Sequence, residues 1–378
     1  MAETVTGPLP LGILTGFLGA GKTTLLNRLL QDEALADTVF IINEFGSVGL
    51  DHLFIEASGE DLVLLSSGCL CCTVRGDLVA TLEDLLAKRD AGTIPPFRRA
   101  MIETTGLADP APVLQAVLGH PVLNRRWSID GVVAVVDAVN GMATLDEHAE
   151  AVKQAAVADR IVLTKTDLVG AEGEAGLARL VARLRRLNPG APLLDAAAGE
   201  ATASALLDAG PFDPSGKIAD VARWLRAEEI AEAAGHAGHD HAKAGEGQDA
   251  HDVDRHDDRV RSFAIVSDAA LPAGALDMFL TLLPATHGAR LLRVKGLVRV
   301  AEEPERPVLV HGVQHLFHPP VLLSRWPDAD RRTRLVFIVR DLDESYVRGL
   351  WEAFANVPAI DRPDRAALTD NPLSLRGR

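Results

Sequence analysis

The sequence is poor in cysteine and lacks any long apolar run. Only three of its 378 residues are cysteines, and Cys69, Cys71 and Cys72 lie within four positions of one another. Because no two of them could join distant parts of the chain, a disulfide-stapled fold is excluded and a reducing compartment is favoured. Nowhere do about 18 uncharged apolar residues follow one another, so no membrane span is predicted. The apolar patch Leu9–Leu18 has no basic stretch before it and is predicted to be a buried strand, not a signal peptide. We therefore expect a cytoplasmic protein with no membrane partner.

Positive charge is also scarce. The chain has 38 Lys and Arg residues against 53 Asp and Glu residues, and its formal net charge is −15. An acidic surface repels phosphate backbones, so we expect no nucleic-acid partner. The 47% of residues that are hydrophobic can fill two packed cores, and the chain length also predicts two domains.

The first part of the chain alternates short apolar runs with longer helical patterns. Strands are predicted at Leu11–Thr15, Val39–Asn43, Leu62–Leu65, Arg99–Glu103, Gly131–Asp137 and Arg160–Thr164. Helices are predicted at Lys22–Gln31, Arg75–Arg89, Pro110–Leu118 and Glu172–Leu187. Continuous Val, Ile and Leu strands between helices indicate a parallel sheet that is buried on both faces. We expect this α/β domain to span residues 1–228.

A change of composition separates a second domain. The predicted flexible linker, residues 229–258, contains His236–Asp258, which holds five of the twelve histidines and has seven acids against two bases. Strands are then predicted at Val260–Ser267, Arg290–Lys295, Leu297–Ala301, Pro307–Gly312 and Thr333–Arg340, and helices at Pro272–Leu283 and Asp343–Phe354. This pattern predicts a smaller α+β domain over residues 259–360 with a largely antiparallel sheet, followed by a tail, 361–378.

Residues 16–23 read Gly-Phe-Leu-Gly-Ala-Gly-Lys-Thr and fit the pattern G-x-x-x-x-G-K-(S/T) between a predicted strand and a predicted helix. Glycines let backbone N–H groups turn onto phosphates, and the helix N-terminus adds the positive end of its dipole. We predict that Lys22 reaches the β- and γ-phosphates and that the Thr23 hydroxyl holds Mg²⁺. The predicted binding residues are Gly16, Gly19, Ala20, Gly21, Lys22, Thr23 and Thr24. A glycine turn in an unrelated loop is the alternative.

The sequence Thr164-Lys165-Thr166-Asp167 follows an apolar strand and is similar to the guanine-specificity pattern N/S/T-K-x-D. The Asp167 carboxylate would accept hydrogen bonds from the guanine N1–H and exocyclic amine, a donor pair that adenine lacks. The Lys165 stem would lie along the base. Thr164 stands where asparagine is usual. A solvated turn is one alternative, and an ATP-dependent kinase is another, against which Asp167 argues.

Two carboxylates end predicted strands beside this loop. Glu103 begins the sequence Glu-Thr-Thr-Gly, and Asp137 ends the next apolar run. A carboxylate at the carboxyl end of a parallel strand is placed to act through Mg²⁺ or to order a water molecule. We predict Glu103 and Asp137, together with Lys22, as catalytic residues, and Gly106 as the point where the backbone approaches the γ-phosphate. Helix capping is the alternative for Glu103, and Asp137 is the weaker candidate.

The three cysteines form a candidate metal site. Three thiols in four residues can converge on one ion, and thiolates suit Zn²⁺ and other borderline metals. An incomplete ligand set suits metal transfer better than a closed structural site. Glu44, on a predicted switch-like loop, is a further candidate ligand or a nucleotide-sensing residue. A redox switch, buried small residues and a solvated Glu44 stay open as alternatives. The linker histidines would gather metal weakly or serve only as a solvated linker.

Taken in order, the motifs resemble the CobW-type metallochaperone GTPases, relatives of UreG and HypB. The matching segments are 16–23, 43–46, 68–72, 103–110, 164–167, the histidine-rich linker and His311–His315. The resemblance implies a P-loop GTPase domain with a mostly parallel sheet, then a CobW C-terminal α+β domain. It implies GTP, Mg²⁺ and Zn²⁺ or Co²⁺ as bound species, metal at the Cys-x-Cys-Cys segment beside the nucleotide, and slow GTP hydrolysis. A client metalloprotein would receive the metal, a homodimer stays open, and a metal buffer or sensor with incidental GTPase activity is the alternative.

Overall fold

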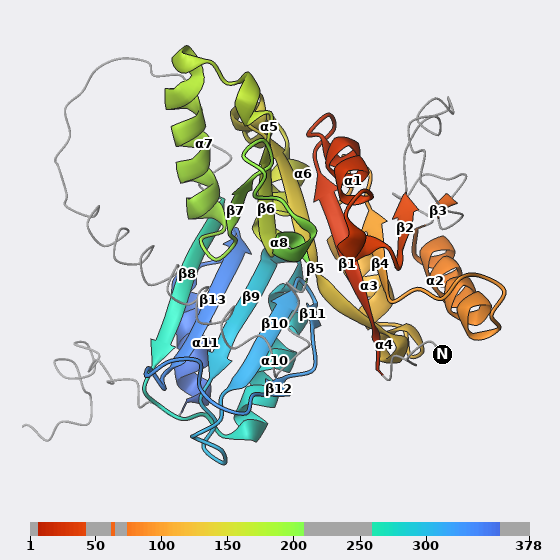
Figure 1. Cartoon of the computed structure of the whole chain (residues 1–378). Coiled ribbons are helices and arrows are strands. Elements are labelled where there is room, and N and C mark those ends of the chain that lie inside the picture. Colours follow the sequence, from red (N-terminus) through yellow and green to blue (C-terminus); the bar gives the residue numbers. More distant parts are fainter. Residues whose placement is uncertain (1–6, 43–61, 65–73, 208–258, 356–378) are drawn as a thin grey trace, which may run out of the picture.

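The computed structural model describes residues 7–42, 62–64, 74–207 and 259–355, which form two domains built on two separate sheets (Figure 1). The N-terminal strands are β1 (Leu9–Gly16), β2 (Thr38–Ile42), β3 (Leu62–Leu64), β4 (Arg99–Glu103), β5 (Trp127–Asp137), β6 (Arg160–Thr164) and β7 (Leu193–Asp195). The N-terminal helices are α1 (Lys22–Leu29), α2 (Val74–Asp90), α3 (Ala111–Leu118), α4 (Leu123–Arg126), α5 (Gly141–Glu147), α6 (Ala149–Val157), α7 (Glu174–Leu187) and α8 (Ala203–Leu206).

The N-terminal sheet is parallel throughout its described strands. Its order is β3-β2-β4-β1-β5-β6-β7, so β1 lies in the centre between β4 and β5. The register sets Leu14 opposite Glu103 and Gly16 opposite Val135, and it sets Asp137 opposite Thr164. Parallel strands end at the same edge, so this register gathers the phosphate loop and the predicted carboxylates there. The predicted α/β class is confirmed.

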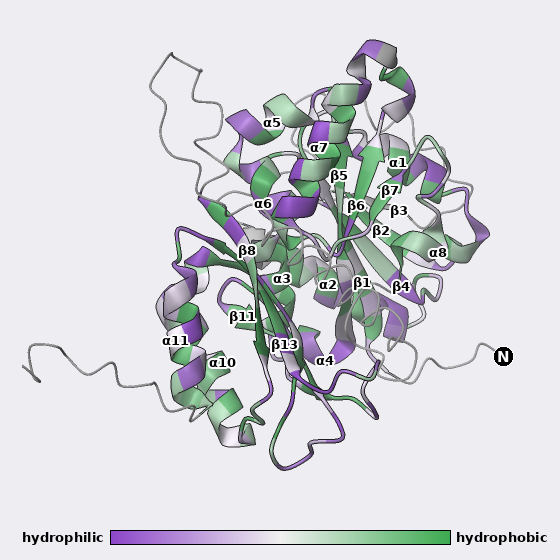
Figure 2. Cartoon of the chain, turned by 90° about the vertical axis from the view of Figure 1, so that its left-hand side faces the viewer, coloured by the Kyte–Doolittle hydropathy of each residue, from purple (hydrophilic) through white to green (hydrophobic). Residues whose placement is uncertain are grey.

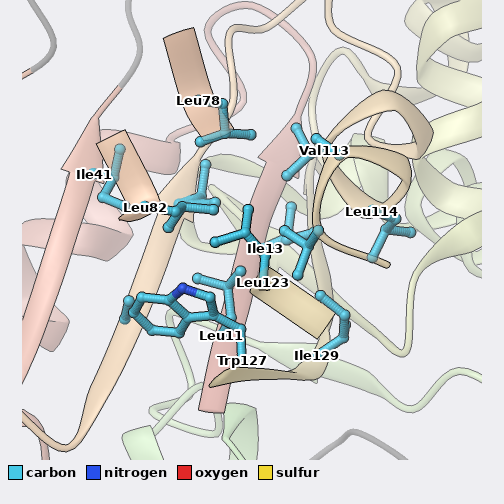
Figure 3. Close-up of a cluster of buried hydrophobic side chains, with 14 of the residues drawn as sticks. Leu11, Ile13, Ile41, Leu78, Leu82, Val113, Leu114, Leu123, Trp127 and Ile129 are labelled. Atoms are coloured by element: carbon cyan, nitrogen blue, oxygen red, sulfur yellow. The ribbon is translucent and has the colours of Figure 1, made fainter. Parts of the chain in front are cut away.

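The core on one face of this sheet shows why its strands read as continuous apolar runs. Leu11 and Ile13 of β1 are fully buried in one cluster with Leu82 of α2 and Leu114 of α3 (Figure 3). Trp127, whose exposed fraction is 1%, belongs to the same cluster. The opposite face of the sheet packs on α1 and α8. Helices therefore cover both faces, and only the sheet edge is left for polar side chains.

The second domain has strands β8 (Val260–Ser267), β9 (Leu291–Val298), β10 (Val308–Val313), β11 (Leu316–Phe317), β12 (Val321–Leu322) and β13 (Thr333–Arg340), with helices α10 (Ala273–His287) and α11 (Glu344–Phe354). Its order is β11-β10-β9-β13-β8, β12 pairs with β10, and all described pairs are antiparallel. The two helices pack on one face, where Phe279 meets Trp351 edge-on at 5.3 Å between ring centroids. Hydrophobic residues concentrate in the strands, and hydrophilic residues alternate with them along α11 (Figure 2). The predicted α+β class is confirmed.

One prediction about this sheet is wrong. Arg290–Lys295 and Leu297–Ala301 were predicted as two strands, but the structure has the single strand β9 running through Gly296. A Cβ atom on Gly296 would lie 2.7 Å from the Cα of Leu335 on the neighbouring strand β13. The glycine therefore permits a close backbone approach within the sheet and does not mark a turn.

Several short elements escaped the sequence patterns. Strand β7 and helices α4, α5, α6 and α8 were not predicted, β5 begins at Trp127 instead of Gly131, and α10 continues through Pro284 to His287. Elements of a few residues gain their stability from neighbours already in place, so they carry little periodic signal of their own. No helix in the described part of the chain combines the length and the apolarity that crossing a bilayer would demand.

The two domains meet through a buried ion pair as well as through apolar contacts. Asp159, just before β6, pairs with Arg293 and, at 3.5 Å, with Lys295, both on β9. The Asp159 side chain is 3% exposed. Burial alone would raise the pKa of Asp159, but the two cations outweigh it and hold that pKa well below its ordinary value. The interface thus contains a buried ion pair whose acid and bases come from different domains.

Candidate functional site

The phosphate loop joins β1 to α1 in a shape that glycine permits. Gly16, Gly19 and Gly21 have φ values of 148°, 71° and 92°, a range that L side chains rarely adopt. Lys22 is 9% exposed, and its ammonium group donates to the carbonyl oxygens of Gly16 at 2.9 Å and Phe17 at 3.2 Å. The amine therefore lies over its own loop, where an incoming phosphate oxygen would meet it.

A carboxylate from the neighbouring strand reaches the start of α1. The Thr23 hydroxyl donates to Oε1 of Glu103 at 3.3 Å, and Glu103 is 6% exposed. Thr104 fastens the end of β4 to β1, because its N–H donates to the Leu14 carbonyl at 2.9 Å and its hydroxyl donates to Thr15 at 2.9 Å. A hydroxyl and a carboxylate side by side are the oxygen ligands that Mg²⁺ prefers, so this pair fits a magnesium ion bound with a nucleotide.

The loop after Glu103 rests on the tip of the phosphate loop. A Cβ atom on Gly106 would lie 2.6 Å from the backbone nitrogen of Leu18, so only glycine allows this approach. From α6, the buried side chain of Gln154 donates to the carbonyl oxygens of Gly106 at 3.2 Å and Ala108 at 3.0 Å. Gln154 was not among the predicted site residues, because α6 itself was missed and no motif includes it.

The predicted base-recognition residues pack against the other side of the phosphate loop. The Thr164 hydroxyl donates to the Ala20 carbonyl at 2.6 Å. Lys165, with a left-handed φ of 59°, donates to the Gly19 carbonyl at 2.8 Å and to Oδ2 of Asp137 at 2.7 Å. Threonine thus supplies a hydroxyl that fixes the loop from the strand end, and Lys165 bridges the loop to β5.

Asp137 is the centre of a dense hydrogen-bond set. Besides Lys165, it accepts from the backbone N–H groups of Val139 and Asn140 and from the Asn140 side chain. Burial would raise the pKa of Asp137, but these donors, Lys165 foremost, lower it below its ordinary value. The described contacts of Asp137 hold Lys165 in place, and its predicted catalytic role stays a prediction.

Asp167 lies on the short 3₁₀ helix Thr166–Leu168 and its side chain is exposed, not buried as a closed base pocket would make it. The Thr166 hydroxyl donates to Oδ1 of Asp195 at 2.7 Å, and Asp195 also accepts from the N–H groups of Ala197 and Ala198. The loop after β7 therefore flanks the predicted base site. Asp195 was missed because its strand was missed.

Of the predicted metal ligands, the Mg²⁺ ligand Thr23 is described, whereas the predicted transition-metal ligands fall outside the described residues. Glu44, Cys69, Cys71 and Cys72 are among them, as is the histidine-rich segment His236–Asp258. Within the ranges that the structure does describe, no three His, Cys, Asp or Glu side chains gather into a group that would hold a metal ion. The metal site stays a prediction from the sequence.

A glycine-shaped phosphate loop, a Thr–Glu pair beside it and a T-K-T-D segment against it all lie at one edge of a parallel sheet. Together they define a protein of the P-loop GTPase class.

Comparison with known proteins identifies the family. The CobW/HypB/UreG nucleotide-binding domain matches residues 10–195, and the cobalamin synthesis protein cobW C-terminal domain matches residues 260–355. The chain is 33% identical to the zinc chaperone YjiA of Escherichia coli over 93% of this chain and 99% of that protein. It is 32% identical to a zinc chaperone CobW of a Sinorhizobium species, over 92% of this chain and 97% of that protein. The crystal structure of Zn(II)-bound YjiA GTPase from E. coli superposes with a TM-score of 0.65 at 28% identity, covering 92% of this chain and 99% of that one. The chain belongs to the CobW family.

Proposed function

We propose that this GTPase is a metallochaperone that binds a transition metal at Cys69, Cys71 and Cys72 and passes it to a client protein under the control of GTP. The observation that carries this proposal is the register of three strands. Ile42, the last residue of β2, lies opposite both Glu103 and Leu64, the last residue of β3. Strands β2 and β3 therefore end at the same edge as the phosphate site, and Glu44 and the cysteines follow these two strands in the sequence.

For hydrolysis, each described residue has a task that follows from its position. Lys22 exchanges the carbonyl oxygens of its own loop for the phosphate oxygens of GTP, which are stronger partners for an ammonium group. Thr23 and Glu103 would hold Mg²⁺, and the ion would supply positive charge to neutralise the transferring phosphate. Lys165 and Asp167 receive the guanine, with Asp137 and Asp195 holding the segment that presents them.

In this proposal the affinity for the metal depends on the bound nucleotide. GTP binding brings Glu44 and the thiolates into one ligand set, and hydrolysis removes the γ-phosphate contacts and weakens that set. Zinc is favoured over cobalt as the cargo, because the two relatives matched over nearly their whole length are named zinc chaperones. Thiolate ligands suit either ion.

The test is a titration of Co²⁺ and Zn²⁺ into reduced protein with Mg²⁺ and a non-hydrolysable GTP analogue, with GDP or with no nucleotide. Thiolate-to-cobalt charge transfer reports binding at the cysteines. We expect one tight site with the GTP analogue that weakens at least tenfold with GDP and disappears in Cys71→Ser/Cys72→Ser. Equal metal affinity in all three nucleotide states would contradict the coupling.

A metal buffer or sensor is the second candidate, favoured by the five histidines of residues 236–258. Deleting these residues separates the two functions. A chaperone keeps its single tight, nucleotide-dependent site after the deletion, whereas a buffer loses most of its metal capacity. The deletion lies outside the two sheets, so GTP hydrolysis by the same protein serves as the control for folding.

A further inference from the structure

The turn between β10 and β11 extends from the C-terminal domain into the N-terminal one. Val313 is 4% exposed and belongs to the same buried cluster as Leu114 and Val117 of α3. The next residue, Gln314, has a left-handed φ of 54°, and its N–H donates to the Leu291 carbonyl at 2.8 Å. The turn is therefore anchored by an apolar residue on one side and by β9 on the other, and it presents the Gln314 side chain to α3.

Gln314 meets the carboxylate that ends the loop after Glu103. Its Nε2 donates to Oδ2 of Asp109 at 3.1 Å. The same oxygen accepts from the Lys153 ammonium of α6 at 3.2 Å, and the other oxygen accepts from the Ala111 N–H at 2.9 Å, where α3 begins. Asp109 is thus fixed by three donors, and one of them belongs to the other domain.

The same loop touches the phosphate site at its opposite end. Thr104 hydrogen-bonds to Leu14 and Thr15 of β1, Gly106 packs on Leu18 of the phosphate loop, and Gln154 holds two carbonyl groups between these points. The loop from Glu103 to Asp109 is short and is restrained at both ends. Displacement of Asp109 therefore acts on Glu103 and Gly106 through backbone that has little slack.

We propose that Gln314 is a positioning residue for GTP hydrolysis, through which the C-terminal domain holds the catalytic loop of the N-terminal domain. Gln314 touches neither Glu103 nor the phosphate loop in any described contact. Its amide oxygen accepts from the Gln115 side chain of α3 at 3.5 Å, and its amide nitrogen acts on the loop by fixing Asp109. A partner that binds the β10–β11 turn and draws Gln314 away from Asp109 therefore slows hydrolysis. The inference rests on the proposed GTP hydrolysis.

Two substitutions separate the contact from the backbone. Gln314→Glu keeps the shape of the side chain but opposes two carboxylates. Gln314→Gly removes the side chain while accepting the left-handed backbone without strain. We expect each to lower kcat for GTP by about threefold to tenfold, with KM changed less than twofold, because neither substitution changes Lys22 or the other residues of the phosphate loop itself. Asp341→Gly is the matched control: Asp341 is also left-handed, with a φ of 52°, but its carboxylate pairs with Arg259 within the C-terminal domain.

Rescue provides the decisive arm. In Asp109→Asn/Gln314→Glu the introduced amide can donate to the introduced carboxylate, and its oxygen can still accept from the Ala111 N–H, while the Lys153 ammonium loses its acceptor on residue 109. We expect the double variant to have a higher kcat than Gln314→Glu. Unchanged kcat in both single variants, or an equal loss in Asp341→Gly, would overturn the inference. If the wild-type protein shows no GTP hydrolysis with Mg²⁺, the proposed function fails first, so the two failures are distinguishable.

Discussion

The two sheets of this molecule place their polar side chains in opposite ways. In the parallel sheet, Lys22, Glu103, Thr164 and Asp137 gather at the edge where the strands end, next to one glycine loop. In the antiparallel sheet, the buried polar side chains include Arg293, His311 and His318, which surround the contact with the N-terminal domain. A parallel sheet leaves a natural site at the ends of its strands, whereas an antiparallel sheet with helices on one face leaves its other face for a partner.

This difference divides the work between the domains. The N-terminal domain provides the groups for nucleotide chemistry, and the C-terminal domain contributes Gln314 and the cations that pair with Asp159. Substitutions at Asp159, Lys22 and His318 disturb, in turn, the contact between the domains, the phosphate site and the buried histidines of the C-terminal domain. Each substitution tests whether one domain can be altered without the other.

The largest effect on folding is expected from Asp159→Asn. This change leaves Arg293 and Lys295 buried without their carboxylate, and removing one partner of a buried ion pair costs about 3–5 kcal/mol. Urea unfolding measures the loss. The matched control is Glu305→Gln, which removes a partner of Arg331 where both side chains are more than half exposed, and it should leave the unfolding midpoint almost unchanged. Similar stability of the two variants would show that the junction is not held by this charge.

Lys22→Ala should remove the chemistry of the parallel sheet and leave the fold intact. Loss of a positive group that meets the transferring phosphate lowers kcat/KM by roughly 10²- to 10³-fold. Phosphate release from GTP reports the rate, and the melting temperature should stay within a few degrees of wild type. Lys88→Ala on α2 is the control, since Lys88 pairs with Asp84 at an exposed site. Hydrolysis by Lys22→Ala within tenfold of wild type would mean that this loop does not hold the phosphates.

The smallest effect is a pH dependence from the second sheet. The rings of His311 and His318 stack at 4.8 Å, and they face Asp159, Arg293 and Lys295. Burial lowers the pKa of His318 to about 4, while Asp159 raises this pKa and Arg293 lowers it. Burial, together with the charges of His318 and Arg293, lowers the pKa of His311 well below 6.5. The unfolded chain therefore binds more protons between pH 6.5 and 4, so stability falls as the pH falls through this range.

By pH 5.5 His318 should have removed roughly 1 kcal/mol of unfolding free energy relative to pH 7, and His311 acts in the same direction. His318→Gln, which stays neutral, should flatten the dependence of unfolding free energy on pH in urea titrations at pH 7, 6.25 and 5.5. His148, which is partly exposed and stacks on Phe17, gives the control substitution His148→Gln. An undiminished slope in His318→Gln would assign the acid sensitivity to other groups.

Much of the fold was readable because its strands are long apolar runs with a motif at their ends. β4, β6, β8 and β13 have the predicted bounds, since Arg99, Arg160, Val260 and Thr333 each begin a run that a charged or polar residue closes. Gly296 was wrongly predicted to separate two strands, because a glycine needed for close backbone approach looks the same in sequence as one that makes a turn. Short elements such as β7 were missed because their few residues carry no recognisable pattern, and hydrogen bonds from a neighbouring strand stabilise them.

The site divides in a similar way. Local motifs predicted the phosphate loop and a carboxylate, Glu103, at the end of a strand beside it, whereas the hydrogen bond between Thr23 and Glu103 was found only in the structure. Local motifs could not predict three further contacts, because each joins elements that are apart in the sequence. These contacts are Thr166 with Asp195, Gln154 with Gly106, and Gln314 with Asp109. Segments 103–110 and 311–315, which carry the family resemblance, contain Asp109 and Gln314, but nothing in the sequence linked one segment to the other.

The most direct test of the account is base selectivity. Displacement of a fluorescent GTP analogue by unlabelled GTP and by ATP should be measured with wild-type protein and with Asp167→Ala, in Mg²⁺ and at one ionic strength. If the edge of the parallel sheet forms a guanine site, GTP displaces the probe at roughly 10²-fold or more lower concentration than ATP, and Asp167→Ala narrows that ratio. Equal displacement by GTP and ATP from the wild-type protein would contradict the assignment of Lys165 and Asp167 and, with it, the GTP-gated function.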